Sequence, residues 1–128
     1  MPASANNAGS AERFSRYGLP VFAYAGLIFL VSSIPGEKIP RLFNFQELVF
    51  HSLEYLVFAL LINRAWRVYF PHHSLYRRFF LIFTFALIYA IIDELHQAFV
   101  PGRDTSLTDI GYDGVGIIVG NILYRWPR

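Results

Sequence analysis

Apolar residues fill four stretches of the chain, and short polar segments separate them. A helix needs roughly 20 mostly apolar residues to cross the hydrocarbon core of a bilayer, and each stretch is close to that length. We expect helices over residues 18–34, 46–66, 79–99 and 107–126. Because the links between them are too short for a further domain, the pattern predicts an all-α polytopic membrane protein, an antiparallel bundle of four transmembrane helices.

The first apolar stretch follows a segment of small and polar residues, and it stops at Pro35 and Gly36, which do not continue a helix readily. Residues 1–12 therefore predict a disordered tail, followed by a single membrane domain over residues 13–128. The basic residues ahead of this stretch also fit a cleaved signal peptide, although no A-x-A-like cleavage site follows it.

Polar residues mark the starts of two later stretches. Ser106 and Asp109 match a capping box, in which each side chain accepts a hydrogen bond from the backbone N–H of the other residue. Asn44 and Glu47 have the same spacing before the second stretch. Both pairs predict capped helix starts.

The composition also favours a bilayer environment. Hydrophobic residues make up 55% of the 128 residues and charged residues 16%, against about 25% charged in a typical soluble domain. So short a chain has too much surface to bury that apolar content in water. The absence of Cys excludes disulfides, thiolate nucleophiles and Cys-ligated metals. The net charge of +2 is small and its basic residues are dispersed, so we expect no nucleic-acid partner.

Basic residues divide unevenly between the two ends of the expected bundle. With the N-terminus inside, eight lie on the inner side and three on the outer side. The inner ones are Arg13, Arg16, Arg64, Arg67, Arg77, Arg78, Arg125 and Arg128, and the outer ones are Lys38, Arg41 and Arg103. The positive-inside rule then predicts that both termini are cytoplasmic. All acidic residues except Glu12 fall on the outer side or in the outer half of the membrane.

Polar residues within the expected helices recur at helical spacing. Residues three or four positions apart share one face of a helix, so three helices each carry a polar stripe. The stripes are Glu47, His51 and Glu54; Ala86, Ala90, Asp93 and Gln97, with Glu94 beside them; and Asp109, Asp113, Gly116 and Gly120. Small residues continue two of these stripes and mark helix–helix contacts, so we expect the stripes to face the bundle interior.

Four stripe residues are candidates for catalysis: Asp93, Glu94, His51 and Glu54. An ionised residue near mid-bilayer costs roughly 2.5–3.5 kcal/mol on insertion scales, and such residues are usually functional. Together these four supply general acids and bases at one depth. Close carboxylates must either take up protons or share a cation. A divalent metal ion, held by carboxylate and imidazole ligands, would also compensate their charge.

Further residues of the same region are candidates for substrate binding. Arg103, beside a flexible Pro-Gly pair, is expected to hold a phosphate or carboxylate. The others are Gln97, Asp109 and Asp113. Simpler roles remain open, namely helix capping for Glu47 and Asp109 and a helix–helix hydrogen bond for His51.

Three motifs lie on the expected outer side. They are Ser33-Ile34-Pro35-Gly36, then Glu47-x-x-x-His51-x-x-Glu54-Tyr55, and finally Asp93-Glu94-x-x-Gln97-x-Phe99-x-Pro101-Gly102-Arg103-x-x-Ser106-x-x-Asp109. Together they resemble the VanZ-like family of small bacterial membrane proteins over about residues 18–125. The resemblance adds Ser33 and Tyr55 to the candidate substrate-binding residues. The chain departs from the family at Glu47-Leu48, where Asp-Lys is usual, and at Asp113, where Asn is usual.

The resemblance implies a place in the bacterial plasma membrane and a role in the cell envelope. The family takes its name from a protein associated with low-level resistance to the glycopeptide teicoplanin, and relatives resemble accessory proteins of envelope or exopolysaccharide systems. Three functions are open: an enzyme acting on an envelope lipid or lipid-linked glycan, a non-catalytic accessory or binding protein, and a small ion-coupled transporter. Besides the bilayer, we expect a second copy of the chain or another membrane protein as a partner.

Overall fold

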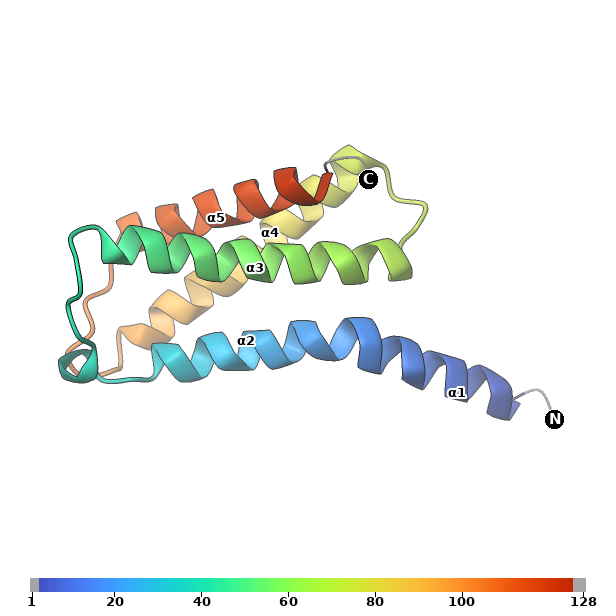
Figure 1. The fold of residues 1–128 in the computed structure, drawn as a ribbon, viewed down its shortest axis with the longest axis horizontal. Coiled ribbons are helices and arrows are strands. Elements are labelled where there is room, and N and C mark those ends of the chain that lie inside the picture. Colours follow the sequence, from blue (N-terminus) through green and yellow to red (C-terminus); the bar gives the residue numbers. More distant parts are fainter. Residues whose placement is uncertain (1–2, 126–128) are drawn as a thin grey trace.

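The computed structural model describes the backbone of residues 3–125 and the side chains of residues 7–124. Within that range the chain is all-helical and contains no strand. Its elements are α1 (Ala3–Arg13), the π-turn η1 (Phe14–Gly18), α2 (Leu19–Ser32), the 3-10 turn η2 (Gly36–Lys38), α3 (Gln46–Tyr69), α4 (Leu75–Gln97) and α5 (Leu107–Arg125). Figure 1 shows them as long rods that run back and forth along one axis.

The N-terminal segment differs from the expectation of a disordered tail. Helix α1, the π-turn η1 and helix α2 follow one another without a break and form one long rod (Figure 1). The N–H of Leu19 bonds to the carbonyl of Phe14, the spacing of a π-turn. Side chains from residues 7 to 16 are exposed. The first helix therefore begins well before residue 18.

The other three helices lie where the apolar pattern predicts them. Helix α3 begins at Gln46 as expected and extends to Tyr69, and α5 begins at Leu107 as expected. Helix α4 is shifted toward the N-terminus and covers Leu75–Gln97, because Ser74 caps it by accepting a hydrogen bond from the N–H of Arg77. The expected last residue of α5, at position 126, lies outside the described residues.

The predicted cap of α3 was wrong. Its N-cap is Phe45, in the left-handed region with φ of 63°, and no side chain caps the helix there. The Gln46 side chain instead holds the preceding loop, since its Oε1 accepts from Leu42 N at 2.7 Å and its Nε2 donates to Pro40 O at 3.2 Å. The turn into α3 is fixed by this amide rather than by Asn44.

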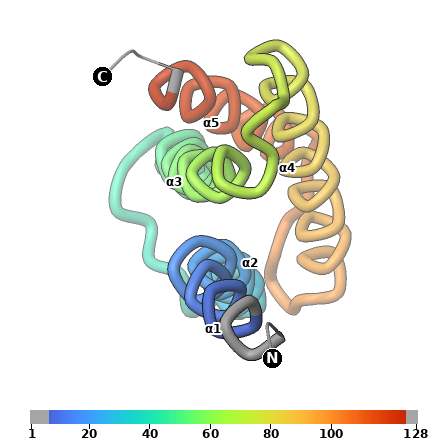
Figure 2. The backbone as a smooth tube through the Cα atoms, turned by 90° about the vertical axis from the view of Figure 1, so that its right-hand side faces the viewer, coloured from blue at the N-terminus to red at the C-terminus, as the bar shows by residue number. Residues whose placement is uncertain are grey.

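Helices α3 and α5 share the most extensive interface, and glycines make it possible. A Cβ at Gly116 would lie 2.2 Å from the carbonyl oxygen of Ser52, and one at Gly120 would lie 2.7 Å from that of Leu56. The two backbones are thus in direct contact along the small-residue stripe. Viewed along the rods, α3 lies between α2 and α5, and α4 runs along one side (Figure 2).

Within the described part of the chain, three helices are long and apolar enough to cross a membrane: Asn7–Ser32, Gln46–Tyr69 and Leu75–Gln97. Much of their apolar surface faces outward, and Phe22 and Phe80 are 66% and 67% exposed. Exposed apolar side chains on this scale are compatible with a lipid environment. Helix α5 is not among the three, so its place as a fourth span is not established by this criterion.

Two loops meet at one end of the bundle, and the termini and the α3–α4 link lie at the other (Figure 1). The N–H of Gly36, after α2, donates to the carbonyl of Pro101, after α4, at 3.0 Å. A Cβ at Gly36 would lie only 1.7 Å from the carbonyl oxygen of Gly102, which itself has φ of +73°. Only glycine permits this approach, and it fixes the end of α2 against the end of α4.

Candidate functional site

A pocket of about 550 Å³ opens at the end where the two loops meet. Its wall comes from the ends of α2 and α4, the starts of α3 and α5 and both loops. It combines apolar, cationic and acidic side chains. The residues that line it are Val31, Ser32, Ile34, Gly36, Lys38, Ile39, Pro40, Arg41, Gln46, Glu47, Phe50, His51, Glu54, Gln97, Gly102, Arg103, Asp104 and Asp109. Its size suits a small headgroup.

Lys38, Arg41 and Arg103 bring three cationic side chains to this pocket. These are the only basic residues that the sequence places on this side. They come from both loops, and the contact between Gly36 and Pro101 holds those loops together. Arg41 and Lys38 are exposed. The pocket therefore offers three cationic groups to an anionic ligand, beside the four carboxyl groups of Glu47, Glu54, Asp104 and Asp109.

Arg103 also has a structural contact that the sequence did not predict. Its Nε donates to the carbonyl of Ile34 at 2.9 Å, and its Nη2 donates to that of Val31 at 2.8 Å. Val31 lies in the last turn of α2 and Ile34 follows the helix; the Val31 carbonyl also accepts from Ile34 N at 3.2 Å. The guanidinium thus caps α2 while it lines the pocket.

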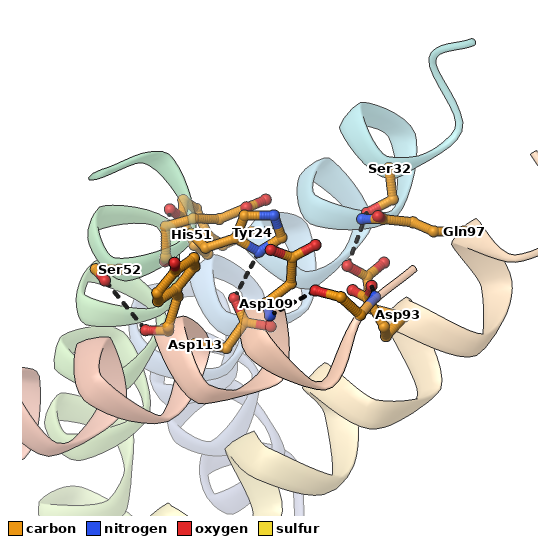
Figure 3. A network of polar contacts seen from close by, with 12 residues as sticks. Tyr24, Ser32, His51, Ser52, Asp93, Gln97, Asp109 and Asp113 are labelled. Atoms are coloured by element: carbon orange, nitrogen blue, oxygen red, sulfur yellow. Dashed lines mark hydrogen bonds and ion pairs between the residues drawn. The ribbon is translucent and has the colours of Figure 1, made fainter. Parts of the chain in front are cut away.

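His51 and Asp113 form a pair between α3 and α5 (Figure 3). His51 Nδ1 lies 2.8 Å from Asp113 Oδ1, and Asp113 is 1% exposed. The contact is made through Nδ1, so Nε2 is the ring nitrogen left for a ligand. His51 lines the pocket. A carboxylate that orients an imidazole in this way is a common acid–base arrangement.

Asp93 lies behind the pocket wall rather than in it. Ser32 Oγ donates to Asp93 Oδ2 at 2.7 Å and accepts from Gln97 Nε2 at 3.1 Å (Figure 3). All three side chains are buried, and both Ser32 and Gln97 line the pocket. Asp93 Oδ1 and the hydroxyl of Tyr55 are buried without a hydrogen-bond partner among the described residues. This cluster places a carboxylate one hydrogen bond away from the pocket.

Ser32 was missed by the sequence analysis, which selected its neighbour. Ser33 donates to the carbonyl of Phe29 at 2.7 Å, lies 2.9 Å from His96 Nε2, and does not line the pocket. A signal for Ser32 was present, because it follows Tyr24 and Ile28 at intervals of four residues and Ile28 is 1% exposed. That spacing places Ser32 on the inward face of α2.

Glu94 takes the place that Asp109 was expected to fill in the cap of α5. Asp109 N donates to Ser106 Oγ at 3.1 Å, as the capping pattern predicts. The N–H of Ser106, however, donates to Glu94 Oε1 at 3.0 Å. Glu94 therefore ties the start of α5 to the end of α4, and Asp109 is left to line the pocket.

This contact gives a direct test of the role of Glu94. Glu94→Gln keeps an oxygen that accepts from Ser106, so we expect stability within about 0.5 kcal/mol of wild type. Glu94→Ala removes the acceptor and is expected to cost about 1 kcal/mol, the usual effect of losing a cap. Thermal unfolding in detergent would measure both. Equal losses in the two variants would show that the charge, and not the cap, is important.

The remaining predicted residues fall on both sides of the pocket wall. Glu54 lines the pocket and lies within electrostatic range of His51 and Arg103. Tyr55, by contrast, is fully buried in the bundle core and does not line it. The structure therefore brings His51, Glu54, Gln97, Arg103 and Asp109 to one pocket. Asp93 and Asp113 lie behind its wall and bond to the lining residues Ser32 and His51, whereas Glu94 bonds to the backbone of Ser106.

The donor set does not favour a metal centre. Among the described residues, no group of three or more His, Asp or Glu side chains is arranged to hold a metal ion. His51 and Asp113 bond to each other, and Glu94 bonds to the backbone of Ser106.

The long apolar helices and the polar pocket at one end of the bundle define a helical membrane protein. A sequence model of the VanZ/LLP1 family matches residues 18–128, and the chain belongs to that family. No curated protein and no solved structure matches the chain.

Proposed function

We propose that all four rods, α5 included, cross the bacterial plasma membrane and that both termini are cytoplasmic, with residues 13–128 forming one domain. The support is the division of charge, since eight Lys or Arg residues fall on the side of the termini and three on the side of the pocket. Cytoplasmic loops of membrane proteins carry such an excess. The pocket then faces outward, at the outer leaflet.

We further propose that the pocket binds the phosphate-bearing headgroup of an envelope lipid or of a lipid-linked glycan. The observation that carries this proposal is the meeting of three cationic residues in one pocket at the end of the apolar helices. Arginine and lysine are the usual partners of phosphate. Val31, Ile34 and Phe50 line the same pocket and offer apolar contact to the adjoining lipid. A role in glycopeptide resistance or exopolysaccharide systems would follow from binding such a lipid.

Native mass spectrometry of the protein purified in detergent would test this binding. We expect a phosphate-bearing lipid on the wild type and its loss, by roughly 10-fold or more in occupancy, in Lys38→Gln/Arg41→Gln. Arg103 is left intact because it caps α2. The control is Arg13→Gln/Arg77→Gln, which removes the same charge at the opposite end. Unchanged lipid in the pocket variant would overturn the proposal, and a bare wild type would favour an accessory role with a protein partner.

A second candidate function is processing of that lipid, with His51 as general acid or base. The specific observation is the bond of 2.8 Å between His51 Nδ1 and Asp113, which orients the ring in the pocket wall. Glu54 and the Ser32–Asp93 pair would supply further polar contacts to the reacting group. If the protein processes the lipid, we expect the mass of the lipid bound to wild type to change on incubation. The lipid bound to His51→Gln should keep its original mass. No change of mass in wild type would leave binding alone.

An ion-coupled transporter is the less favoured alternative. Such a protein needs polar groups along a path through the membrane. Inward of the pocket, the buried side chains of Asn63 and Asn121 hydrogen-bond to each other. Asn63 Nδ2 donates to Asn121 Oδ1 across α3 and α5, a contact that suits helix packing, while Asn121 Nδ2 has no partner among the described residues.

A further inference from the structure

Two arginines from different helices converge on one tyrosine ring at the end opposite the pocket. The Cζ of Arg67, in α3, lies 5.8 Å from the centre of the Tyr124 ring, in α5. The Cζ of Arg78, in α4, lies 5.9 Å from the same centre. Both distances are within the range of a cation–π contact. The ring of α5 therefore lies against one guanidinium group from α3 and one from α4.

Among the residues that the structure describes, these two guanidinium groups have no carboxylate partner. Among the described residues, the one ion pair joins His51 to Asp113, in the other half of the molecule. Of the acidic residues, only Glu12 falls in the half that contains Arg67 and Arg78. Arg67 and Arg78 are close enough to act on each other electrostatically. Like charges held together repel, and an anion between them would offset that repulsion.

A second arginine pair makes the same kind of contact with another tyrosine ring, that of Tyr17 in η1. The Cζ of Arg64 lies 4.8 Å and that of Arg16 5.7 Å from the centre of the Tyr17 ring. Arg64 and Arg67 are three residues apart in the last turns of α3, so the two pairs lie at the same depth. That depth is the end of an apolar span, where lipid phosphates lie.

We propose that Arg67 and Arg78, held by Tyr124, form a binding site for the phosphate of an anionic phospholipid in the leaflet opposite the pocket. Guanidinium forks bind phosphate through paired hydrogen bonds, which an aromatic ring below them leaves available. Basic clusters between helices recognise anionic headgroups on the cytoplasmic side of membranes. Arginines that only set the membrane topology could lie anywhere in the loops at this end. That role alone would not require Arg67 and Arg78 to meet at one tyrosine ring. The site is separate from the pocket and does not depend on its function.

The test compares two charge-matched variants of the full-length protein in phosphatidylglycerol nanodiscs and, separately, in phosphatidylcholine nanodiscs. Arg67→Gln/Arg78→Gln removes the proposed site. Arg13→Gln/Arg77→Gln removes two exposed arginines of the same end that have no ring contact among the described residues. Native mass spectrometry after release into detergent counts the lipids retained. We expect retention of phosphatidylglycerol to fall roughly 10- to 30-fold in the first variant and less than about 3-fold in the second.

Each alternative outcome is distinguishable. Equal losses in the two variants would overturn the proposal in favour of unspecific charge. Equal retention of phosphatidylcholine and phosphatidylglycerol by wild type would overturn the preference for an anionic lipid. Displacement of the lipid by millimolar inorganic phosphate would show a site for free phosphate instead. Arg67→Lys/Arg78→Lys keeps the charge and the fold, and we expect partial retention from it, whereas full retention would contradict the need for the guanidinium fork.

Discussion

His51→Ala is expected to lower the free energy of unfolding by about 3 kcal/mol, the largest effect of any substitution that we consider. The variant leaves the carboxylate of Asp113, which is 1% exposed, without the imidazole that lies 2.8 Å from it. Removing one partner of a buried charged pair typically costs about 3–5 kcal/mol, because the other charge stays buried and uncompensated. Unfolding by sodium dodecyl sulfate in mixed micelles would measure the loss.

A double-mutant cycle separates this pairing from the packing of the two side chains. His51→Ala/Asp113→Ala removes both charges, so we expect it to lose less stability than the two single variants together, by about 1–3 kcal/mol. Glu47→Ala is the control, since Glu47 is exposed and lies one turn earlier on α3, and its effect should stay within about 0.5 kcal/mol. Additive losses in the cycle would contradict a direct interaction.

Gly116→Ala is expected to cost about 2–3 kcal/mol, although alanine is the better helix former. Its Cβ would lie 2.2 Å from the carbonyl oxygen of Ser52, which is backbone and cannot rotate away. The helices α3 and α5 must separate to admit it, and overpacking of this kind costs about 1–3 kcal/mol. Thermal unfolding in detergent would show the loss as a lower midpoint.

The same helix supplies the matched control for this glycine. Gly111 also lies in α5, but a Cβ there would meet nothing within 4 Å. Gly111→Ala should therefore gain stability, by about 0.5–1 kcal/mol, from the lower backbone entropy of alanine in the unfolded chain. The two substitutions are expected to have opposite signs. A loss at both positions would show that α5 tolerates no alanine for a reason other than its contact with α3.

The helices and their inward faces could be predicted from the sequence because each depends on neighbours along the chain. The first residues of α3 and α5 follow from the apolar stretches. The Gly116–Gly120 spacing correctly predicts a helix–helix contact, although not that the partner is α3. The polar stripes were predicted to face the bundle interior, and Asp93, Gln97 and Asp113 are indeed buried. Family membership also rested on sequence alone, through motifs that the VanZ/LLP1 model matches over residues 18–128.

The partners of the polar groups could not be predicted in the same way. Spacing on one helix says which residues share a face, but it says nothing of the axial offset or rotation of the next helix. That offset pairs His51 with Asp113, places Ser32 rather than Ser33 against Asp93, and gives the cap of α5 to Glu94. The disordered tail was expected because its residues bury little, a property that does not prevent the segment from continuing the helix that follows it.

The sequence by itself determined that this protein is a bundle of apolar helices with its acids gathered toward one end, since length, hydropathy and charge are properties of the chain alone. The tertiary structure decided which of those acids face the pocket and which support it. The physical reason is the contact of Gly36 with Pro101 and Gly102, which joins the end of α2 to the end of α4. That contact brings Arg103 into one pocket with Lys38 and Arg41, from a position that is far from both in the sequence.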